Sequence, residues 1–193
     1  MSYVLHAVNA KGAPSGPVRS CLRDRRMREQ AVENPQSKAA GDLPYFGYGT
    51  LLGLTQMRKN YPSAEPLGLA FYDQHELGFW RYADASDGGC TIVYDPDSIL
   101  FGVLYRLSKA DMAKLLAVGG LAEWYEAREL DVTRVTGGRV RAITLRVEGN
   151  RGPWVPPTAY ASLVTNGAVE ANLPAEYRAK LDGIVAKARR DAA

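Results

Sequence analysis

The sequence predicts an α+β fold, a small mixed β-barrel with flanking helices. Short β-type segments recur between clusters of Asp, Gly and Pro, and two amphipathic stripes with helical spacing lie at residues 108–118 and 174–189. The chain has 193 residues, of which 46% are apolar and 23% charged, a balance typical of globular proteins. This length accommodates one well-buried domain with an extension.

The first 42 residues are expected to form a basic extension outside the domain. They are rich in Gly, Pro, Ser and Asn, with one short helix expected around residues 24–33 that Pro35 would end. This segment holds seven Lys or Arg against four Asp or Glu, whereas the remainder holds seventeen of each. A basic segment can bind nucleic acid, but a solvated extension is the expected role, and nucleic acid is not an expected partner. The domain proper is assigned to residues 43–193.

The β-type segments begin at Leu43. Tyr45 and Phe46 suit a buried strand that ends in a turn containing glycine. Four further strands are expected at residues 67–72, 76–82, 90–94 and 100–106. The turns between them hold Asp, Gly and Pro, and one of these turns contains His75.

A helix, a hairpin and a second helix complete the domain. Ser108 and Asp111 form a capping box at the start of the first helix, in which Met112, Leu115 and Leu116 share one face. Residues 125–135 and 140–147 flank Thr136-Gly137-Gly138, which predicts a hairpin because glycine adopts positive φ without strain. In the last helix Pro174 suits the first turn, and an apolar stripe follows: Tyr177, Leu181, Ile184, Val185 and Ala188.

The sequence indicates no cofactor and no metal site. Cys21 and Cys90 lie in unlike contexts and form no metal-binding pair, so reduced thiols in the cytoplasm are expected. Cys90 suits a buried, unreactive position in a strand. No apolar stretch is long enough to span a bilayer, and the N-terminus has no secretory pattern, so neither secretion nor membrane insertion is predicted. His6 and His75 are expected to face solvent.

One motif points to a function. The strand that begins the domain runs into Tyr48-Gly49-Thr50-Leu51. This tetrapeptide resembles the first-strand motif of the gamma-glutamylcyclotransferases, in the form found in the gamma-glutamylamine cyclotransferase branch.

The resemblance continues along the chain. Phe101-Gly102-Val103-Leu104-Tyr105 is similar to a later strand of that family, and the helix after it falls where the family has one. Asn166-Gly167-Ala168 and residues 172–177 resemble the family's closing segment. The resemblance therefore covers about residues 43–188.

The motif also has a physical logic of its own. A glycine turn exposes backbone N–H groups, and without a Cβ at Gly49 a ligand can approach the main chain closely, which favours a carboxylate or an amide oxygen. The resemblance implies that a small γ-glutamyl amide or peptide binds here and is cyclised to 5-oxoproline. It also implies the substrate-binding residues: Tyr48, Gly49, Thr50, Leu51 and Tyr125.

The carboxylate that serves as general base in this family is missing from its expected position. The α-ammonium of the substrate must lose a proton before it attacks, and the family uses a Glu just after the helix. That position falls on Val118 or Gly119 here. Glu123 and Glu126 are the remaining candidate catalytic residues, with a surface carboxylate as the alternative for each.

Three functions stay open at this point. The chain could be a lyase or acyltransferase of the gamma-glutamylcyclotransferase type, using a relocated carboxylate. It could instead be a non-catalytic or differently catalytic relative that binds a less polar small molecule in the same pocket, lined in part by Trp80, Trp124 or Trp154. It could also be an interaction protein that docks through its basic extension. The sequence leaves open whether the chain forms a homodimer.

Overall fold

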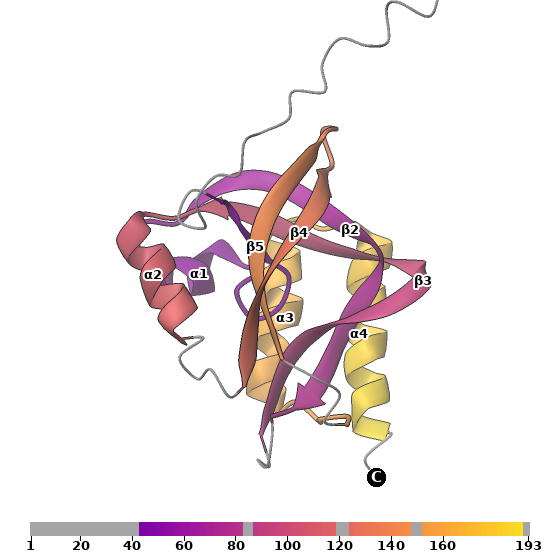
Figure 1. Ribbon diagram of the computed structural model, residues 1–193. Coiled ribbons are helices and arrows are strands. Elements are labelled where there is room, and N and C mark those ends of the chain that lie inside the picture. Colours follow the sequence, from indigo (N-terminus) through magenta and orange to yellow (C-terminus); the bar gives the residue numbers. More distant parts are fainter. Residues whose placement is uncertain (1–42, 83–86, 119–123, 148–151, 191–193) are drawn as a thin grey trace, which may run out of the picture. The chain divides into compact units, whose positions relative to one another are not determined.

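The computed structural model describes residues 43–82, 87–118, 124–147 and 152–190. Within these residues five strands close into a barrel in the order β1-β3-β2-β4-β5, and four helices flank it (Figure 1). All neighbouring strands are antiparallel except β1 and β5, which are parallel and meet where Tyr45 pairs with Ile143. The predicted mixed barrel with flanking helices is confirmed. The predicted extension lies outside the described residues.

The four strands expected between residues 67 and 106 are in fact two long ones. β2 spans Glu65–Arg81 and β3 spans Gly88–Arg106. They pair from Glu65 opposite Arg106 to Arg81 opposite Gly88, except at Leu67 and Gln74 of β2 and at residues 95–98 of β3. The turn expected at His75 is an irregularity within β2, where Gln74 has a φ of 60° and the register shifts between Asp73 and His75. β2 continues through this irregularity, so the prediction of a turn was wrong.

The hairpin prediction is confirmed. β4 (Tyr125–Arg134) and β5 (Arg139–Val147) pair in register from Tyr125 opposite Val147 to Thr133 opposite Arg139. Gly137 and Gly138 have φ values of 99° and 87°, a conformation that favours glycine.

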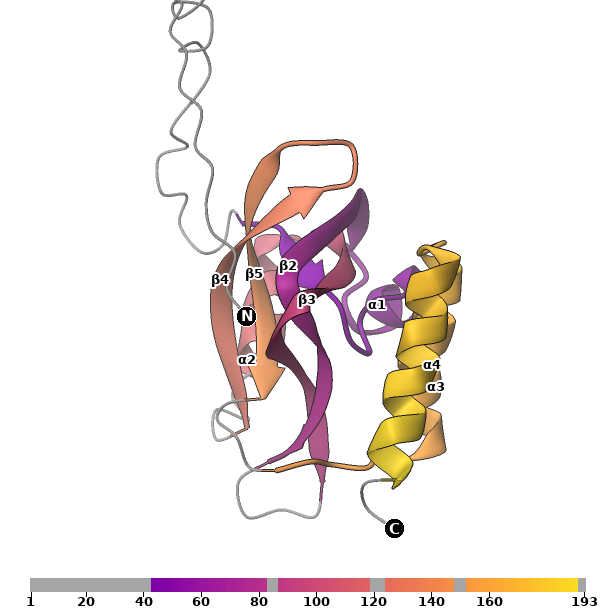
Figure 2. The same ribbon diagram turned by 90° about the vertical axis from the view of Figure 1, so that its right-hand side faces the viewer.

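Two helices were predicted within the domain, and the described residues contain four. The helix expected around residues 24–33 lies outside the described residues. α2 (Lys109–Val118) and α4 (Ala175–Arg190) match the predictions. α1 (Leu54–Asn60) has seven residues, too few for a periodic signal, and α3 (Thr158–Glu170) contains Thr, Asn and Gly, which favour helices weakly. Tertiary packing stabilises α3 despite its weak helix propensity, since α3 runs beside α4 and also contacts α1 (Figures 1 and 2).

The capping box at α2 forms only in part. The Asp111 backbone N–H donates to Ser108 Oγ at 3.1 Å, as predicted. The Asp111 carboxylate, however, does not return to Ser108. It accepts the Ser63 backbone N–H at 2.9 Å and the Ser63 hydroxyl at 2.5 Å, while Ser63 Oγ accepts the backbone N–H of Ser108. The loop before β2 is thereby fixed to the start of α2.

The core fills the barrel and the space beneath the helices. Phe46, Leu100 and Leu104 are fully buried, as are Val164 of α3 and Leu181 of α4. Two buried hydroxyls in the wall are satisfied by main-chain carbonyls: Thr144 donates to Phe46 and Thr91 to Val147. Among the described residues, no helix has the length and apolarity required to cross a bilayer.

Candidate functional site

A cavity of about 300 Å³ opens beside the turn that follows β1. This volume lies at the lower end of the range for small-molecule pockets. Its lining comes from strands β1, β3, β4 and β5, from the turn, and from helices α1 to α3 or their flanks. The lining residues are Tyr45, Tyr48, Gly49, Thr50, Leu51, Asn60, Tyr61, Cys90, Lys114, Tyr125, Leu145 and Tyr160. All five predicted substrate-binding residues are therefore cavity residues. Their role toward a ligand remains a prediction.

The turn is held in place by hydrogen bonds, and β3 approaches it closely. The Leu52 N–H donates to the Gly49 carbonyl at 3.0 Å, and the Tyr48 hydroxyl donates to the Leu145 carbonyl at 2.9 Å. A Cβ on Gly49 would lie 2.8 Å from both Cβ and Sγ of Cys90. Glycine is thus required here by the close approach of β3.

The cavity is walled largely by tyrosine. Tyr160 accepts the backbone N–H of Cys90 at 3.1 Å, and the hydroxyls of Tyr125 and Tyr82 lie 2.8 Å apart. Burial raises the pKa of the Tyr48, Tyr125 and Tyr160 phenols well above the usual value. These groups stay protonated at neutral pH, so they cannot act as the base for a ligand. The single O–H of Tyr48 is donated to the Leu145 carbonyl, and that of Tyr160 to Cys90 Sγ.

Cys90 is buried in the cavity wall, as predicted. Burial raises the pKa of its thiol from 9.0 to about 11, although the Tyr160 hydroxyl, 3.5 Å from Sγ, opposes the shift. A thiol that stays protonated is a poor nucleophile. Cys90 therefore shapes the cavity and does not supply covalent chemistry.

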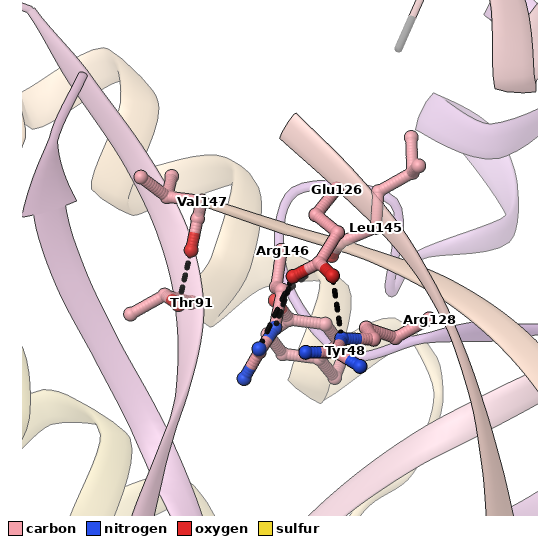
Figure 3. A network of polar contacts seen from close by, with 7 residues as sticks. All are labelled: Tyr48, Thr91, Glu126, Arg128, Leu145, Arg146 and Val147. Atoms are coloured by element: carbon pink, nitrogen blue, oxygen red, sulfur yellow. Dashed lines mark hydrogen bonds and ion pairs between the residues drawn. The ribbon is translucent and has the colours of Figure 1, made fainter. Parts of the chain in front are cut away.

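Glu126, one of the two predicted bases, is held in ion pairs away from the cavity (Figure 3). Its carboxylate lies 3.1 Å from Arg146, directly across the hairpin, and 2.7 Å from Arg128. Successive side chains on a strand point to opposite faces. Because Tyr125 and Leu145 face the cavity, their neighbours Glu126 and Arg146 face the other way.

The other predicted base, Glu123, lies outside the described residues, as does Gly119. None of the described lining residues is an Asp or a Glu. Lys114 is the one charged side chain among them. The sequence reasoning did not predict Lys114 or Tyr160 as cavity residues, because Lys114 lies on the polar side of its helix and Tyr160 belongs to the helix that was not predicted.

The other candidates have structural roles. Trp80, Trp124 and Trp154 do not line the cavity. Trp124 stacks on Tyr82 with ring centroids 5.0 Å apart, while Trp154 is buried. His75 is half-buried rather than solvent-facing, and it stacks on Tyr72 at 4.2 Å. No cluster of His, Cys, Asp or Glu within the described part of the chain could hold a metal ion.

Comparison with known proteins gives consistent results. A gamma-glutamylcyclotransferase of Bos taurus is 24% identical over 165 residues, covering 82% of this chain and 87% of the relative. A gamma-glutamylcyclotransferase of Mus musculus is 28% identical over 148 residues, covering 72% of this chain and 77% of the relative. No family model matches the sequence.

The fold comparison agrees with the sequence comparison. A solved gamma-glutamyl cyclotransferase superposes with a TM-score of 0.68 at 24% identity, covering 73% of this chain and 86% of that chain. The resemblance indicated by the turn motif is thus confirmed: the chain is similar to gamma-glutamylcyclotransferases in sequence and in fold.

Proposed function

We propose that this protein binds a small γ-glutamyl amide or peptide in the tyrosine-walled cavity and releases 5-oxoproline from it slowly. The observation that carries the proposal is the shared location of the Tyr48 to Leu51 turn and Tyr125. These residues come from distant parts of the sequence, yet they line one cavity of about 300 Å³. Relatives named as gamma-glutamylcyclotransferases support the same reaction class.

The reaction requires one proton acceptor and one set of donors. The α-ammonium loses a proton, its nitrogen attacks the γ-carbonyl carbon, and an oxyanion develops on the carbonyl oxygen. The oxyanion then collapses and the bond to the leaving nitrogen breaks. The new ring nitrogen gives up a second proton, and the leaving group takes up both protons and departs as an ammonium. Backbone N–H groups of the turn are suited to stabilise the oxyanion, as is the Tyr125 phenol, which can accept from Tyr82 and donate to the ligand. Donors held in place need no reorganisation as charge develops.

Removal of the proton from the α-ammonium is the step that slows the reaction. Both oxygens of Glu126 already accept guanidinium donors, so Glu126 is the weaker candidate. We assign the role to Glu123, which precedes cavity residue Tyr125 by two positions in the sequence. A misplaced or absent general base typically costs about 10²–10⁴ in rate. Turnover well below that of an ordinary cyclotransferase is therefore expected.

The test is direct measurement of 5-oxoproline from γ-glutamyl-L-alanine. Native protein should release it slowly, Glu123→Gln should release none, and Glu126→Gln should retain the native rate. Val118→Glu and Gly119→Glu place a carboxylate where the family has one, and either should accelerate release. Robust turnover that survives both Glu123→Gln and Glu126→Gln would refute the assignment of the base.

A binding protein without catalysis is the second candidate. It is favoured by one observation: the described lining contains five tyrosines, Leu51, Leu145 and Cys90 but no carboxylate. In that case calorimetry should detect a less polar ligand binding in the cavity, with no 5-oxoproline formed by any variant that keeps the native residues at 118 and 119. Glu123→Gln would then change nothing measurable.

A further inference from the structure

A second tyrosine lies behind Tyr125. Tyr82 directly follows β2 and is not one of the lining residues, whereas Tyr125 begins β4 and lines the cavity. The two hydroxyl oxygens lie 2.8 Å apart, and the rings meet edge to face with centroids 5.4 Å apart. Tyr82 is thus linked to the cavity through the hydroxyl of Tyr125.

Neighbouring residues hold the two hydroxyls together. The Tyr82 ring stacks on Trp124 with an interplanar angle of 12°, and the Tyr82 backbone N–H donates to the Asp87 carbonyl at 3.0 Å. Gly89 of β3 leaves room for both hydroxyls, because a Cβ there would overlap the Tyr125 hydroxyl and lie 2.9 Å from that of Tyr82. The pair is therefore fixed by packing at the ends of three strands.

The direction of this hydrogen bond follows from the number of hydrogens available. Each phenol has one O–H to donate and can also accept. When Tyr125 donates to a ligand, its oxygen is left to accept, and Tyr82 becomes the donor. Burial raises the pKa of the Tyr82 phenol, so this donor keeps its hydrogen at neutral pH. The other phenol beside Tyr125 is Tyr160, whose hydrogen is donated to Cys90 Sγ.

We infer that Tyr82 is a positioning residue, which donates to Tyr125 and so directs the Tyr125 O–H at the oxyanion that develops in the cavity. This inference rests on the proposed function. Without the Tyr82 hydroxyl, Tyr125 would keep its hydrogen but lose the partner that fixes the rotation of its O–H. Because the oxyanion develops only as the substrate reacts, the effect should appear in kcat and not in binding of the substrate.

A double-mutant cycle tests this coupling. Release of 5-oxoproline from γ-glutamyl-L-alanine is measured by mass spectrometry for native full-length protein, Tyr82→Phe, Tyr125→Phe and the double variant. Phe at residue 82 keeps a ring to stack on Trp124 and removes only the hydroxyl. Tyr94→Phe is the matched control, because Tyr94 is a tyrosine of β3 that is 64% exposed and does not line the cavity.

Tyr82→Phe should lower kcat by about three- to tenfold, the effect of losing one neutral hydrogen bond, and leave KM nearly unchanged. Tyr125→Phe should lower kcat by about 10²-fold, because it removes the donor itself. In the Tyr125→Phe background, Tyr82→Phe should have no further effect, since no hydroxyl remains to be oriented. Tyr94→Phe should match the native protein in kcat and KM.

Two kinds of result would overturn the inference, and they differ in scope. If Tyr82→Phe left kcat unchanged, or lowered it equally with and without the Tyr125 hydroxyl, Tyr82 would not act through Tyr125, while the proposed function would stand. If the native protein released no 5-oxoproline, the proposed function itself would be refuted, and the inference with it.

Discussion

Replacing Gly167 by Ala should destabilise this protein, although Ala is the better helix former. Gly167 lies within α3 and faces Gly53, the residue before α1. A Cβ at residue 167 would lie 2.7 Å from the backbone nitrogen of Gly53 and 3.3 Å from its Cα. Main-chain atoms cannot rotate aside as a long side chain can. The substitution would therefore force α1 and α3 apart.

Two opposing effects set the size of the change. Ala stabilises a helix interior by about 0.8–1 kcal/mol relative to Gly, whereas overpacking a close contact costs about 1–3 kcal/mol. Because the contact is with backbone, we take the upper part of that range and expect a net loss of about 1–2 kcal/mol. Gly183 in α4 is the matched control. It is exposed, and a Cβ there would meet no heavy atom within 4 Å, so Gly183→Ala should gain roughly 0.5–1 kcal/mol.

Urea unfolding followed by far-ultraviolet circular dichroism measures both changes. The two variants should move the midpoint in opposite directions with the slope unchanged. Gly53→Ala provides a second approach to the same contact, because its Cβ would lie 2.9 Å from Gly167 Cα. If Gly167→Ala stabilised the protein as much as Gly183→Ala does, the close approach of α1 and α3 would be refuted.

Two further predictions concern titrating groups. Raising the pKa of Cys90 from 9.0 to about 11 lowers its thiolate fraction at pH 8 by about 100-fold. In a Cys21→Ser background, a thiol reagent should therefore label Cys90 slowly in the folded protein and fast in the urea-unfolded protein. Equal labelling rates would contradict this. Hydrogen bonds from the Ser63 hydroxyl and N–H hold the pKa of Asp111 below its usual value. The contribution of the ionised Asp111 carboxylate to stability should be complete above about pH 4. It should be lost as the pH falls through the folded-state pKa of that carboxyl. The urea midpoints of native protein and Asp111→Asn should therefore converge in acid. A difference that stays constant down to pH 2.5 would contradict the role of the charge.

Features set by local chemistry were predictable from the sequence. The hairpin follows from two adjacent glycines, and both adopt positive φ. α4 follows from its apolar stripe, in which Tyr177, Leu181 and Val185 are buried. The turn after β1 was also predictable, because a strand that runs into glycine indicates a turn, and its Leu52 N–H bonds back to the Gly49 carbonyl.

Features set by tertiary contacts were not predictable in this way. α3 contains Gly167, which weakens the helical signal, yet that glycine is what allows α3 to pack on Gly53. The continuity of β2 through Gln74 depends on pairing with β3, which sequence spacing alone does not reveal. Lys114 reaches the cavity only because Asn60 and Tyr61 of a distant segment are folded against α2.

The pairing of Glu126 had a signal that the sequence reasoning did not use. The hairpin turn fixes the register by placing Thr133 opposite Arg139. Counting seven residues away from the turn along each strand brings Glu126 opposite Arg146. Opposite charges in directly paired positions stabilise one another. A glutamate so placed is better explained as a structural partner than as a free base.

The alternation of side chains along β4 decides which groups can meet a ligand. To turn Glu126 toward the cavity, β4 would have to shift by one residue against β5, and such a shift reverses the facing of every side chain on the strand. Val132, which is fully buried, and Leu130, which packs on the core, would then leave the interior. Burial of two such side chains contributes roughly 3–6 kcal/mol, a large part of the 5–15 kcal/mol that typically stabilises a domain. A shift of this kind is therefore too costly to recruit Glu126, and for this reason the proposal places the base outside β4, at Glu123.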